Sequence, residues 1–451
     1  MTIMKTTYFS KLSFAFLVGL GAATALTSCS FEDEDYFDQP AALRIEQATT
    51  DIQKILVDAP NGWVMQYFTG MNEVEGFNLL ARFDQNGKVT MGSNHRYLRD
   101  GNANKYTEAT SLYQMLREDG PVLAFNTWNE ILTPFIDPVD YKQAPRVLVK
   151  DGEGMHGDHN LVVTSYSKDE ILLRGERYGA IVRMVPCPTE SWQDYIDASA
   201  AAKASFATAA ITNYYVTNGT DTLYFKGLRS GVITYCERIN DPLFPTTINC
   251  VFTPNGFRLH RKNNINGTTF QEFTMAQDST CLVSENDSVR VISCWDNYLL
   301  SRTAVWPFDA SMYTPEQVLI LEKISNELTK YNANYSYAGI GIGRTTSAQS
   351  VYGLVLQFYT NKAKTRTNMA GLSMTFTRKS LGEVVINCPE DAAADNNLQV
   401  IVNRGGAEIL DLMHQFAATI SGNYKVTPNN YFQPSSATYT SSDGSMTFKL
   451  N

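Results

Sequence analysis

The residue with the clearest chemistry in this sequence is Cys29. It ends the run Leu26-Thr27-Ser28-Cys29, which follows a basic start and an apolar segment from Phe14 to Leu26. This order is typical of a lipoprotein signal, in which the thiol takes up diacylglycerol and the chain is cleaved before the cysteine. The apolar segment is well short of the ~20 residues that a membrane-spanning helix needs. The sequence therefore predicts a cleaved signal peptide over residues 1–28 and a membrane anchor of palmitate-like acyl chains at Cys29.

The segment after Cys29 is strongly acidic. Residues 32–35 read Glu-Asp-Glu-Asp, and like charges keep a segment extended and solvated. We interpret residues 29–40 as an acidic tether. The same run resembles the export signal of Bacteroidetes lipoproteins that are routed to the outer face of the cell. We therefore expect an outer-membrane lipoprotein that faces the cell exterior, and the periplasmic face is the alternative.

A second group with possible chemistry is His156, Asp158 and His159, in a glycine-rich loop that begins at Asp151. Two imidazoles and a carboxylate could bind zinc if another element supplied a further ligand. Calcium is a related possibility through the oxygen donors of Asp151, Glu153 and Asp158, although their spacing departs from that of an EF-hand loop. An exposed polar loop without a metal is the alternative interpretation, and we predict no cofactor.

Signatures of common enzymes are absent from the sequence. It contains no H-E-x-x-H motif, no G-x-S-x-G elbow and no P-loop. A carboxylate pair for glycoside hydrolysis is recognised by a separation that only the fold defines. The sequence therefore leaves catalysis uncertain and favours a protein that is not an enzyme.

Tryptophan side chains could act as flat platforms for sugar rings. Trp63, Trp128 and Trp295 lie in or at the end of strand-like runs with apolar neighbours, so we predict that they are core residues. Trp306 stands beside Pro307 in an expected loop and is the candidate ligand-binding residue.

The cysteines allow two interpretations. One hairpin could span the separation between Cys236 and Cys250, and another that between Cys281 and Cys294. Free buried thiols are the alternative. The cysteines besides Cys29 are Cys187, Cys236, Cys250, Cys281, Cys294 and Cys388.

The elements that must position these residues are mostly strands, with a few helices. Apolar spacing predicts helices over about 41–57, 190–210 and 315–332. The last has the best start signal, since Thr314 can cap it and Gln317 can complete a capping box. Glycine and isoleucine alternate from Gly339 to Gly343. This alternation indicates a strand whose glycine side leaves room for another segment to approach closely.

This pattern predicts a β-rich α+β fold in which antiparallel sheets are each flanked by one or two helices. We expect an N-terminal α+β domain over 41–188, a middle β-rich domain over 189–310 and a C-terminal α+β domain over 311–451. The helix-then-strands order recurs at 41, 190 and 315, which suggests repeated modules.

Composition excludes some partners. The 451 residues carry a formal net charge of −9 without a basic stripe, which argues against nucleic acid and against electrostatic binding to anionic membranes. Hydrophobic residues make up 43% and aromatic residues 12% of the chain. Such a composition indicates a folded protein rather than a disordered one.

Several short motifs occur in a distinctive order. They are Phe37-Asp38-Gln39-Pro40 with Arg44, Ala59-Pro60-Asn61-Gly62-Trp63, Phe83-Asp84-Gln85-Asn86-Gly87-Lys88-Val89, Gly157-Asp158 and Met184-Val185-Pro186. Together they resemble a family of Bacteroidetes lipoproteins catalogued as domain of unknown function 4302. The resemblance extends over the mature chain and is most specific over residues 37–188. It implies neighbours of the starch-utilisation type, with an outer-membrane transporter as a partner, and it implies no activity.

Three functions follow as hypotheses. The first is a non-enzymatic surface lipoprotein that binds a nutrient, a glycan or a peptide, or that is an accessory subunit of an outer-membrane uptake complex. The second is a hydrolase whose site is assembled from distant carboxylates or from the His156 and His159 loop. The third is a structural envelope or adhesin module. The sequence favours binding, because surface placement has a signal and catalysis has none.

Overall fold

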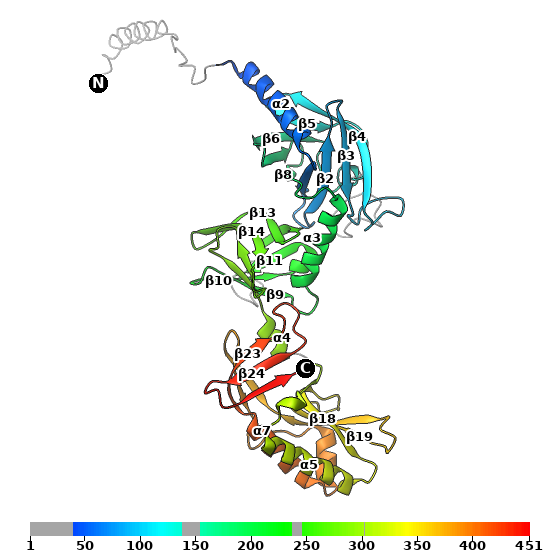
Figure 1. Cartoon of the computed structure of the whole chain (residues 1–451), viewed down its shortest axis with the longest axis vertical. Helices are drawn as coiled ribbons and strands as arrows, with labels where there is room; N and C mark the ends of the chain where they lie inside the picture. Colours follow the sequence, from blue (N-terminus) through cyan, green and yellow to red (C-terminus); the bar gives the residue numbers. More distant parts are fainter. Residues whose placement is uncertain (1–38, 138–153, 237–245, 302) are drawn as a thin grey trace, which may run out of the picture.

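The computed structural model describes residues 39–137, 154–236, 246–301 and 303–451. Cys29 and most of its tether lie outside these ranges. The described chain forms three parts that follow one another along the long axis of the molecule (Figure 1). Two are closed eight-stranded antiparallel barrels, and the third contains a four-stranded and a five-stranded sheet with helices. The prediction of a β-rich α+β fold is confirmed.

The first barrel is an up-and-down meander in which each strand pairs with the next and β1 closes the ring against β8. Helix α2 precedes it. The helix begins after Pro40 and ends where Ala59 becomes extended in front of Pro60. In chain order the elements are α2 (Ala41–Asp58), β1 (Trp63–Phe68), β2 (Phe77–Phe83), β3 (Lys88–Ser93), β4 (Thr107–Arg117), β5 (Pro121–Phe125), η1 (Thr133–Phe135), β6 (Asn160–Tyr166), β7 (Ile171–Gly175) and β8 (Ile181–Pro186).

Side chains fill the interior of the first barrel. Strand β1 alternates, so that Trp63, Met65 and Tyr67 belong to the inner core. Val64 faces the other side of the sheet and joins a separate outer cluster. Helix α2 adds Leu56 to the inner core, and the Leu56 carbonyl accepts a hydrogen bond from the Trp63 indole at 3.0 Å.

The second barrel repeats this plan. A helix is again followed by eight antiparallel strands in chain order, and β16 closes the ring against β9. The elements are α3 (Trp192–Phe206), β9 (Asn213–Thr217), β10 (Thr222–Lys226), η2 (Leu228–Ser230), β11 (Val232–Cys236), β12 (Thr246–Thr253), β13 (Gly256–Ile265), β14 (Thr268–Met275), β15 (Leu282–Ser284) and β16 (Arg290–Ser293).

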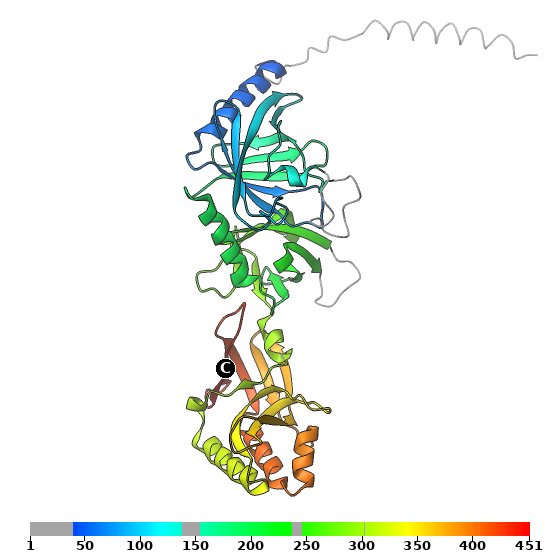
Figure 2. The same ribbon diagram turned by 90° about the vertical axis from the view of Figure 1, so that its right-hand side faces the viewer.

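Helix α3 packs against both barrels, and both views show it beside their junction (Figures 1 and 2). Ser191 caps its start by accepting a hydrogen bond from the Asp194 amide. Near this end Trp192 and Ile196 cover the outer face of the first barrel at Val64. At the other end Phe206 joins the core of the second barrel.

The third part continues the core of the second barrel, because one cluster of buried residues includes both. The predicted capping box is confirmed: Thr314 and Gln317 exchange the two expected hydrogen bonds at the start of α5. The elements are α4 (Trp295–Ser301), β17 (Trp306–Pro307), η3 (Ala310–Met312), α5 (Pro315–Tyr331), β18 (Ser336–Arg344), β19 (Tyr352–Tyr359), β20 (Thr367–Ser373), β21 (Thr375–Ser380), β22 (Glu383–Asn387), α6 (Asn396–Asn403), α7 (Ala407–Thr419), β23 (Gly422–Pro428), β24 (Ala437–Ser441) and β25 (Thr447–Leu450).

None of the six cysteines in the described residues forms a disulfide. Register explains why the first hairpin pair does not bridge: β11 and β12 align Val232 with Asn249, so Cys250 lies opposite Gly231 and not opposite Cys236. The offset of five residues corresponds to about 16 Å along a strand, far beyond disulfide reach. In the described ranges, no helix is both long and apolar enough to cross a membrane.

Candidate functional site

The candidate site is a cleft at the junction of the two barrels, which we call the inter-barrel cleft. Its volume is about 360 Å³. Three parts of the chain line it: the first barrel at the start of β2 with the loops before β2 and after β3, one face of α3, and the end of β12. Clefts between domains are a common position for ligand sites. The lining residues are Glu75, Gly76, Phe77, Asn78, Ser93, Asn94, His95, Arg96, Asn104, Ile196, Ser199, Ala200, Lys203, Val251 and Phe252.

Helix α3 contributes a single face. Its lining residues Ile196, Ser199, Ala200 and Lys203 follow the spacing that places side chains in one row of a helix. Ser199 is turned inward and donates its hydroxyl hydrogen bond to the Tyr195 carbonyl at 2.9 Å. Lys203 is the charged residue of the row, and its side chain keeps 32% of its surface exposed.

The charged centre of the cleft is the carboxylate of Glu75, in the loop between β1 and β2. One oxygen lies 3.3 Å from Nη2 of Arg96, and the other lies 3.4 Å from Nζ of Lys203. Only 16% of the Glu75 side chain is exposed, against 52% for Arg96. Two cations that remain reachable from solvent therefore flank one largely buried anion.

Aromatic rings form the apolar part of the lining. Phe252, at the end of β12, is 7% exposed, and Nζ of Lys203 lies 4.5 Å from its ring centroid. This distance is within the range of a cation–π contact, which holds the ammonium group over the ring. Phe77 at the start of β2 lines the opposite wall. Its ring centroid lies 4.6 Å from that of Phe135.

Hydrogen bonds fix the two walls of the cleft relative to each other. The Gly76 amide donates to the Cys250 carbonyl at 3.0 Å, and Nδ2 of Asn78 donates to the Phe252 carbonyl at 2.7 Å. Oδ1 of Asn78 is buried and has no hydrogen-bond partner in the described residues. Because this oxygen is buried, it is not among the groups that a ligand in the cleft would reach.

His95 is a buried, neutral residue behind the same wall. Its Nδ1 accepts a hydrogen bond from the Tyr97 amide at 3.2 Å, so Nε2 carries the proton and donates to the Ile131 carbonyl at 2.8 Å. Burial lowers the pKa of His95 to about 4. Both ring nitrogens are engaged, so the imidazole has a positioning role and is not available as a proton acceptor.

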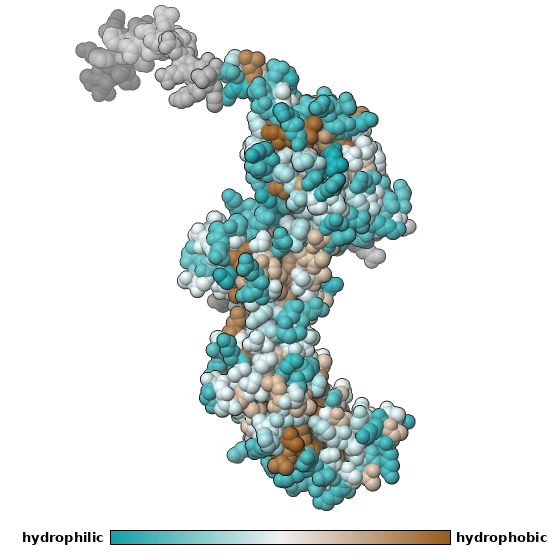
Figure 3. All heavy atoms as spheres, in the orientation of Figure 1, coloured by the Kyte–Doolittle hydropathy of each residue, from teal (hydrophilic) through white to brown (hydrophobic). Residues whose placement is uncertain are grey.

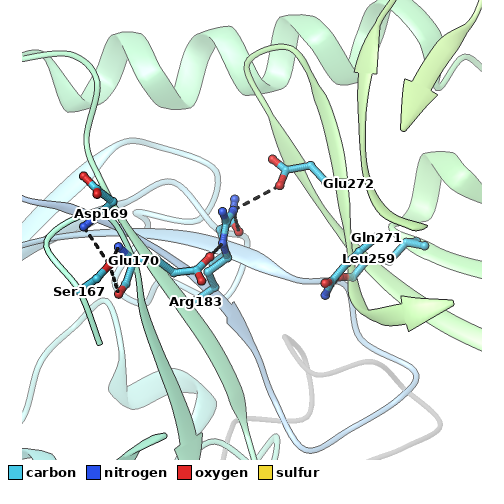
Figure 4. Close-up of polar contacts among 8 residues, drawn as sticks. Ser167, Asp169, Glu170, Arg183, Leu259, Gln271 and Glu272 are labelled. Atoms are coloured by element: carbon cyan, nitrogen blue, oxygen red, sulfur yellow. Dashed lines mark hydrogen bonds and ion pairs between the residues drawn. The ribbon is translucent and has the colours of Figure 1, made fainter. Parts of the chain in front are cut away.

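A cluster of charged residues also connects the barrels (Figure 4). Arg183 of β8 contacts Glu170 at 2.5 Å within the first barrel and Glu272 of β14 at 3.3 Å in the second. Arg258 lies nearby, and burial, followed by the charge of Arg183, lowers its pKa to about 10. This cluster and the hydrogen bonds of the cleft hold the junction at several points.

The His156 loop does not assemble a metal site from the residues that the structure describes. In these ranges, no group of three histidine, cysteine or acidic side chains is placed to hold an ion. His156 stacks on Tyr178, with ring centroids 4.7 Å apart and planes 6° from parallel. His159 is exposed on the surface. Asp151 and Glu153, the other acidic candidates, lie outside the described residues.

Asp158 has a structural environment. Its side chain is 3% exposed and accepts hydrogen bonds from the amides of Arg177 at 2.8 Å, Tyr178 at 2.9 Å and Ala180 at 3.1 Å. A carboxylate that accepts three amides is a strong clamp on the turn between β7 and β8. Both of its oxygens are used, so the contacts favour a role in folding over metal binding.

The tryptophans divide differently from the sequence prediction. Trp63 and Trp295 are 1% and 3% exposed, which confirms them as core residues. The prediction for Trp128 is wrong, because β5 ends at Phe125 and leaves Trp128 in a loop with 52% of its surface exposed. The guanidinium of Arg99 lies 4.8 Å from its ring centroid.

Trp306, the predicted ligand-binding residue, lies in the short edge strand β17. It pairs with Ile342 of β18 and packs partly against the core. Gly341 faces this strand so closely that a Cβ atom there would lie 2.3 Å from the Trp306 carbonyl oxygen, which confirms the close approach predicted for the glycine side of β18. Trp306 is far in sequence from every residue of the inter-barrel cleft, and ligand binding by Trp306 stays a prediction.

Sequence reasoning missed the central residues of the cleft. Glu75 and Arg96 lie in two loops of the first barrel, and Lys203 lies on a helix that follows this barrel, so no local motif connects them. One local signal could have pointed to the cleft. Ile196, Ser199 and Lys203 lie on one face of α3, and a cation on the apolar face of a helix is unusual enough to suggest a buried partner or a ligand.

A family model describes the part of the chain that contains the cleft. The model for a domain of unknown function, DUF4302, matches residues 33–277, which is more than half of the chain. The match includes α2, the first barrel, α3 and the second barrel through β14. No curated protein matches the chain. The protein belongs to the DUF4302 family.

Proposed function

We propose that this protein is a lipid-anchored lipoprotein of the outer membrane that faces the cell exterior and binds a nutrient, a glycan or a peptide, in the inter-barrel cleft. It would act as a non-enzymatic accessory subunit of an uptake system. The observation that supports binding is the composition of the cleft, where the charged groups of Glu75, Arg96 and Lys203 lie beside the rings of Phe77 and Phe252. Sites for small ligands typically combine such apolar walls with a few convergent polar groups.

The state of the titratable groups favours binding over catalysis. Glu75 is engaged by two cations, and both nitrogens of His95 have hydrogen-bond partners. A general base needs a free acceptor within reach of the substrate. The cleft therefore offers recognition groups, and its two candidate proton acceptors are occupied.

Residues 1–40 support the location. The sequence before Cys29 has the order of a lipoprotein signal, and the acidic tether separates the anchor from α2, which begins at Ala41. On the visible face in Figure 3, apolar spheres form small separate groups among hydrophilic ones. Such a surface suits a protein that is held at a membrane by its terminus.

Binding is tested with the soluble chain from Ser30 onward on glycan and peptide arrays. We expect a specific ligand whose binding is lost in Lys203→Met and kept in Lys330→Met. Lys330 is a matched control, since it also pairs with a glutamate, Glu327, but lies on α5 in the third part. Equal binding by the two variants would show that the cleft is not the site.

Mass spectrometry of the bound ligand checks for cleavage, and cleavage would favour the hydrolase alternative. An array without hits would favour a structural module.

The location is tested in whole cells. We expect externally added protease to remove the protein from intact cells, and Cys29→Ser to release it from the membrane fraction. Protection of the wild-type protein in intact cells would place it on the periplasmic face instead.

A further inference from the structure

The charge of the inter-barrel cleft is opposite to that of the whole chain. The described residues that line it include two cations, Arg96 and Lys203, against the single anion Glu75, while His95 is neutral. The complete chain has a formal net charge of −9. A local excess of positive charge in an acidic protein favours an anionic ligand at this position.

The cations are arranged to accept a further anion. Glu75 is more deeply buried than its partners and holds each of them from one side. The ammonium of Lys203 has three donors and the guanidinium of Arg96 has five, so one carboxylate does not exhaust them. Their exposed sides face solvent, where a ligand carboxylate could receive charge-assisted hydrogen bonds from both.

The fold argues against a peptide bound by its main chain. The strands that line the cleft are β2, the end of β3 and β12, and each has hydrogen-bonded neighbours on both sides in a closed barrel. A peptide that adds a strand needs an open sheet edge, and closed barrels have none. The lining instead offers side-chain groups. Asn94 and Asn104 present amides that can both donate to and accept from hydroxyl groups.

We propose that the inter-barrel cleft binds an acidic glycan, with the carboxylate of a uronic acid residue between Arg96 and Lys203. Neighbouring hydroxyl groups bind the amides of Asn94 and Asn104, and the ring lies beside Phe252. This inference rests on the proposed binding function and specifies its ligand class.

A matched pair of ligands tests the proposal directly. The probes are oligogalacturonides and the same oligomers after reduction of their carboxyl groups, titrated into the soluble chain by calorimetry. Because hydrogen bonds to a charged group contribute about 1.5–3 kcal/mol, we expect the acidic oligomers to bind about 10–150 times more tightly than the reduced ones. Binding of the acidic oligomers also weakens as the salt concentration rises.

Two variants assign the effect to the cleft. Arg96→Gln and Lys203→Met each reduce the difference between acidic and reduced oligomers about tenfold, whereas Lys330→Met leaves it unchanged. Thermal unfolding of each variant shows whether the fold is retained. Because each variant is compared on two ligands, a partly unfolded sample lowers both affinities and does not mimic loss of charge discrimination.

The outcomes separate the inference from the proposed function. If other glycans or peptides bind in a Lys203-dependent way but the acidic oligomers have no advantage, the uronate proposal is wrong and the binding function stands. If the acidic oligomers bind equally to wild type and to both cleft variants, the cleft is not their site. If neither oligomer binds, the acidic-glycan assignment is overturned, and the wider arrays decide whether the protein binds a nutrient at all.

Discussion

The carboxylate of Glu75, in a loop of the first barrel, lies 3.4 Å from Nζ of Lys203 on the helix that leads into the second barrel. Arg96 approaches the other carboxylate oxygen at 3.3 Å. One acidic side chain therefore lies between two cations that would otherwise repel each other across the junction.

This arrangement predicts unequal effects of removing its members. Glu75→Gln leaves Arg96 and Lys203 facing each other without an anion, so we expect the free energy of unfolding to fall by about 1–2 kcal/mol. Lys203→Met leaves Glu75 paired with Arg96 and should cost less than about 1 kcal/mol. Urea unfolding measures both values. A larger loss for Lys203→Met would contradict the central role of the carboxylate.

Acid should destabilise the protein through His95. The unfolded chain binds a proton near pH 6.5, while burial lowers the pKa in the folded protein to about 4. The unfolded state therefore takes up more protons between these values, and stability falls as the pH drops from about 6.5 towards 4. A tenfold difference in proton affinity between the two states corresponds to about 1.4 kcal/mol, so the loss from His95 is of order 2–3 kcal/mol at pH 4.

The variant His95→Gln checks this assignment. It lacks the titrating group, so its free energy of unfolding should change less between pH 7 and pH 4.5 than that of the wild type, whatever its starting value. The pKa of His260 is also lowered to about 4, first by burial and then by Arg261. His260 should therefore also reduce the free energy of unfolding as the pH falls, and this part of the loss should remain in His95→Gln. Equal slopes for wild type and His95→Gln would show that His95 does not govern the acid response.

Asp158 should matter for folding and not for metal binding. Asp158→Asn replaces a carboxylate that accepts three backbone amides and places an amide group where one acceptor oxygen was. We expect a loss of about 2–3 kcal/mol in the free energy of unfolding. Chelation, or addition of zinc or calcium, should leave the melting temperature of the wild type unchanged. A clear rise with either ion would restore the metal hypothesis for this loop.

An ion pair between α4 and β21 of the third part lies against the second barrel. Nε of Arg378 lies 2.5 Å from Oδ2 of Asp296, whose side chain is 7% exposed, and the guanidinium lies 5.3 Å from the ring centroid of Tyr215. Arg378→Met leaves the Asp296 carboxylate buried without its partner. We expect a loss of about 2–4 kcal/mol, measured by urea unfolding.

The double variant Asp296→Asn with Arg378→Met identifies the cause. It should recover part of the stability that Arg378→Met loses, because it removes the unpaired charge. A double variant as unstable as the sum of the two single variants would mean that the residues act independently.

The sequence predicted the helices and strands better than it predicted that the strands close into barrels. The periodicity of α2 and the capping box at Thr314 were readable because they depend on residues close in the chain. The two barrels were not, since closure depends on pairings such as Trp63 with Pro186, far apart in sequence. The long strand β4 was missed, and the strand expected up to Trp128 ends at Phe125.

The candidate site was predictable only in part. The sequence drew attention to His156, Asp158 and His159 because polar residues with ligand chemistry are adjacent there, but adjacency does not make side chains converge. Asp158 turns inward to the amides of a turn, and His159 turns outward. The cleft depends on how α3 packs against the two closed barrels. This packing involves residues far apart in the chain, so no local sequence pattern predicts it.

Because α3 packs against both barrels, it determines when the first barrel can be fully covered during synthesis. A chain that emerges from its amino terminus completes β8 before Trp192, Tyr195 and Ile196 appear. Until then, the first barrel has an uncovered apolar strip that includes Val64 and Leu80, because their partners in the finished protein come from α3. A nascent chain paused before residue 192 would therefore expose this strip, be prone to aggregate and be a target for a chaperone.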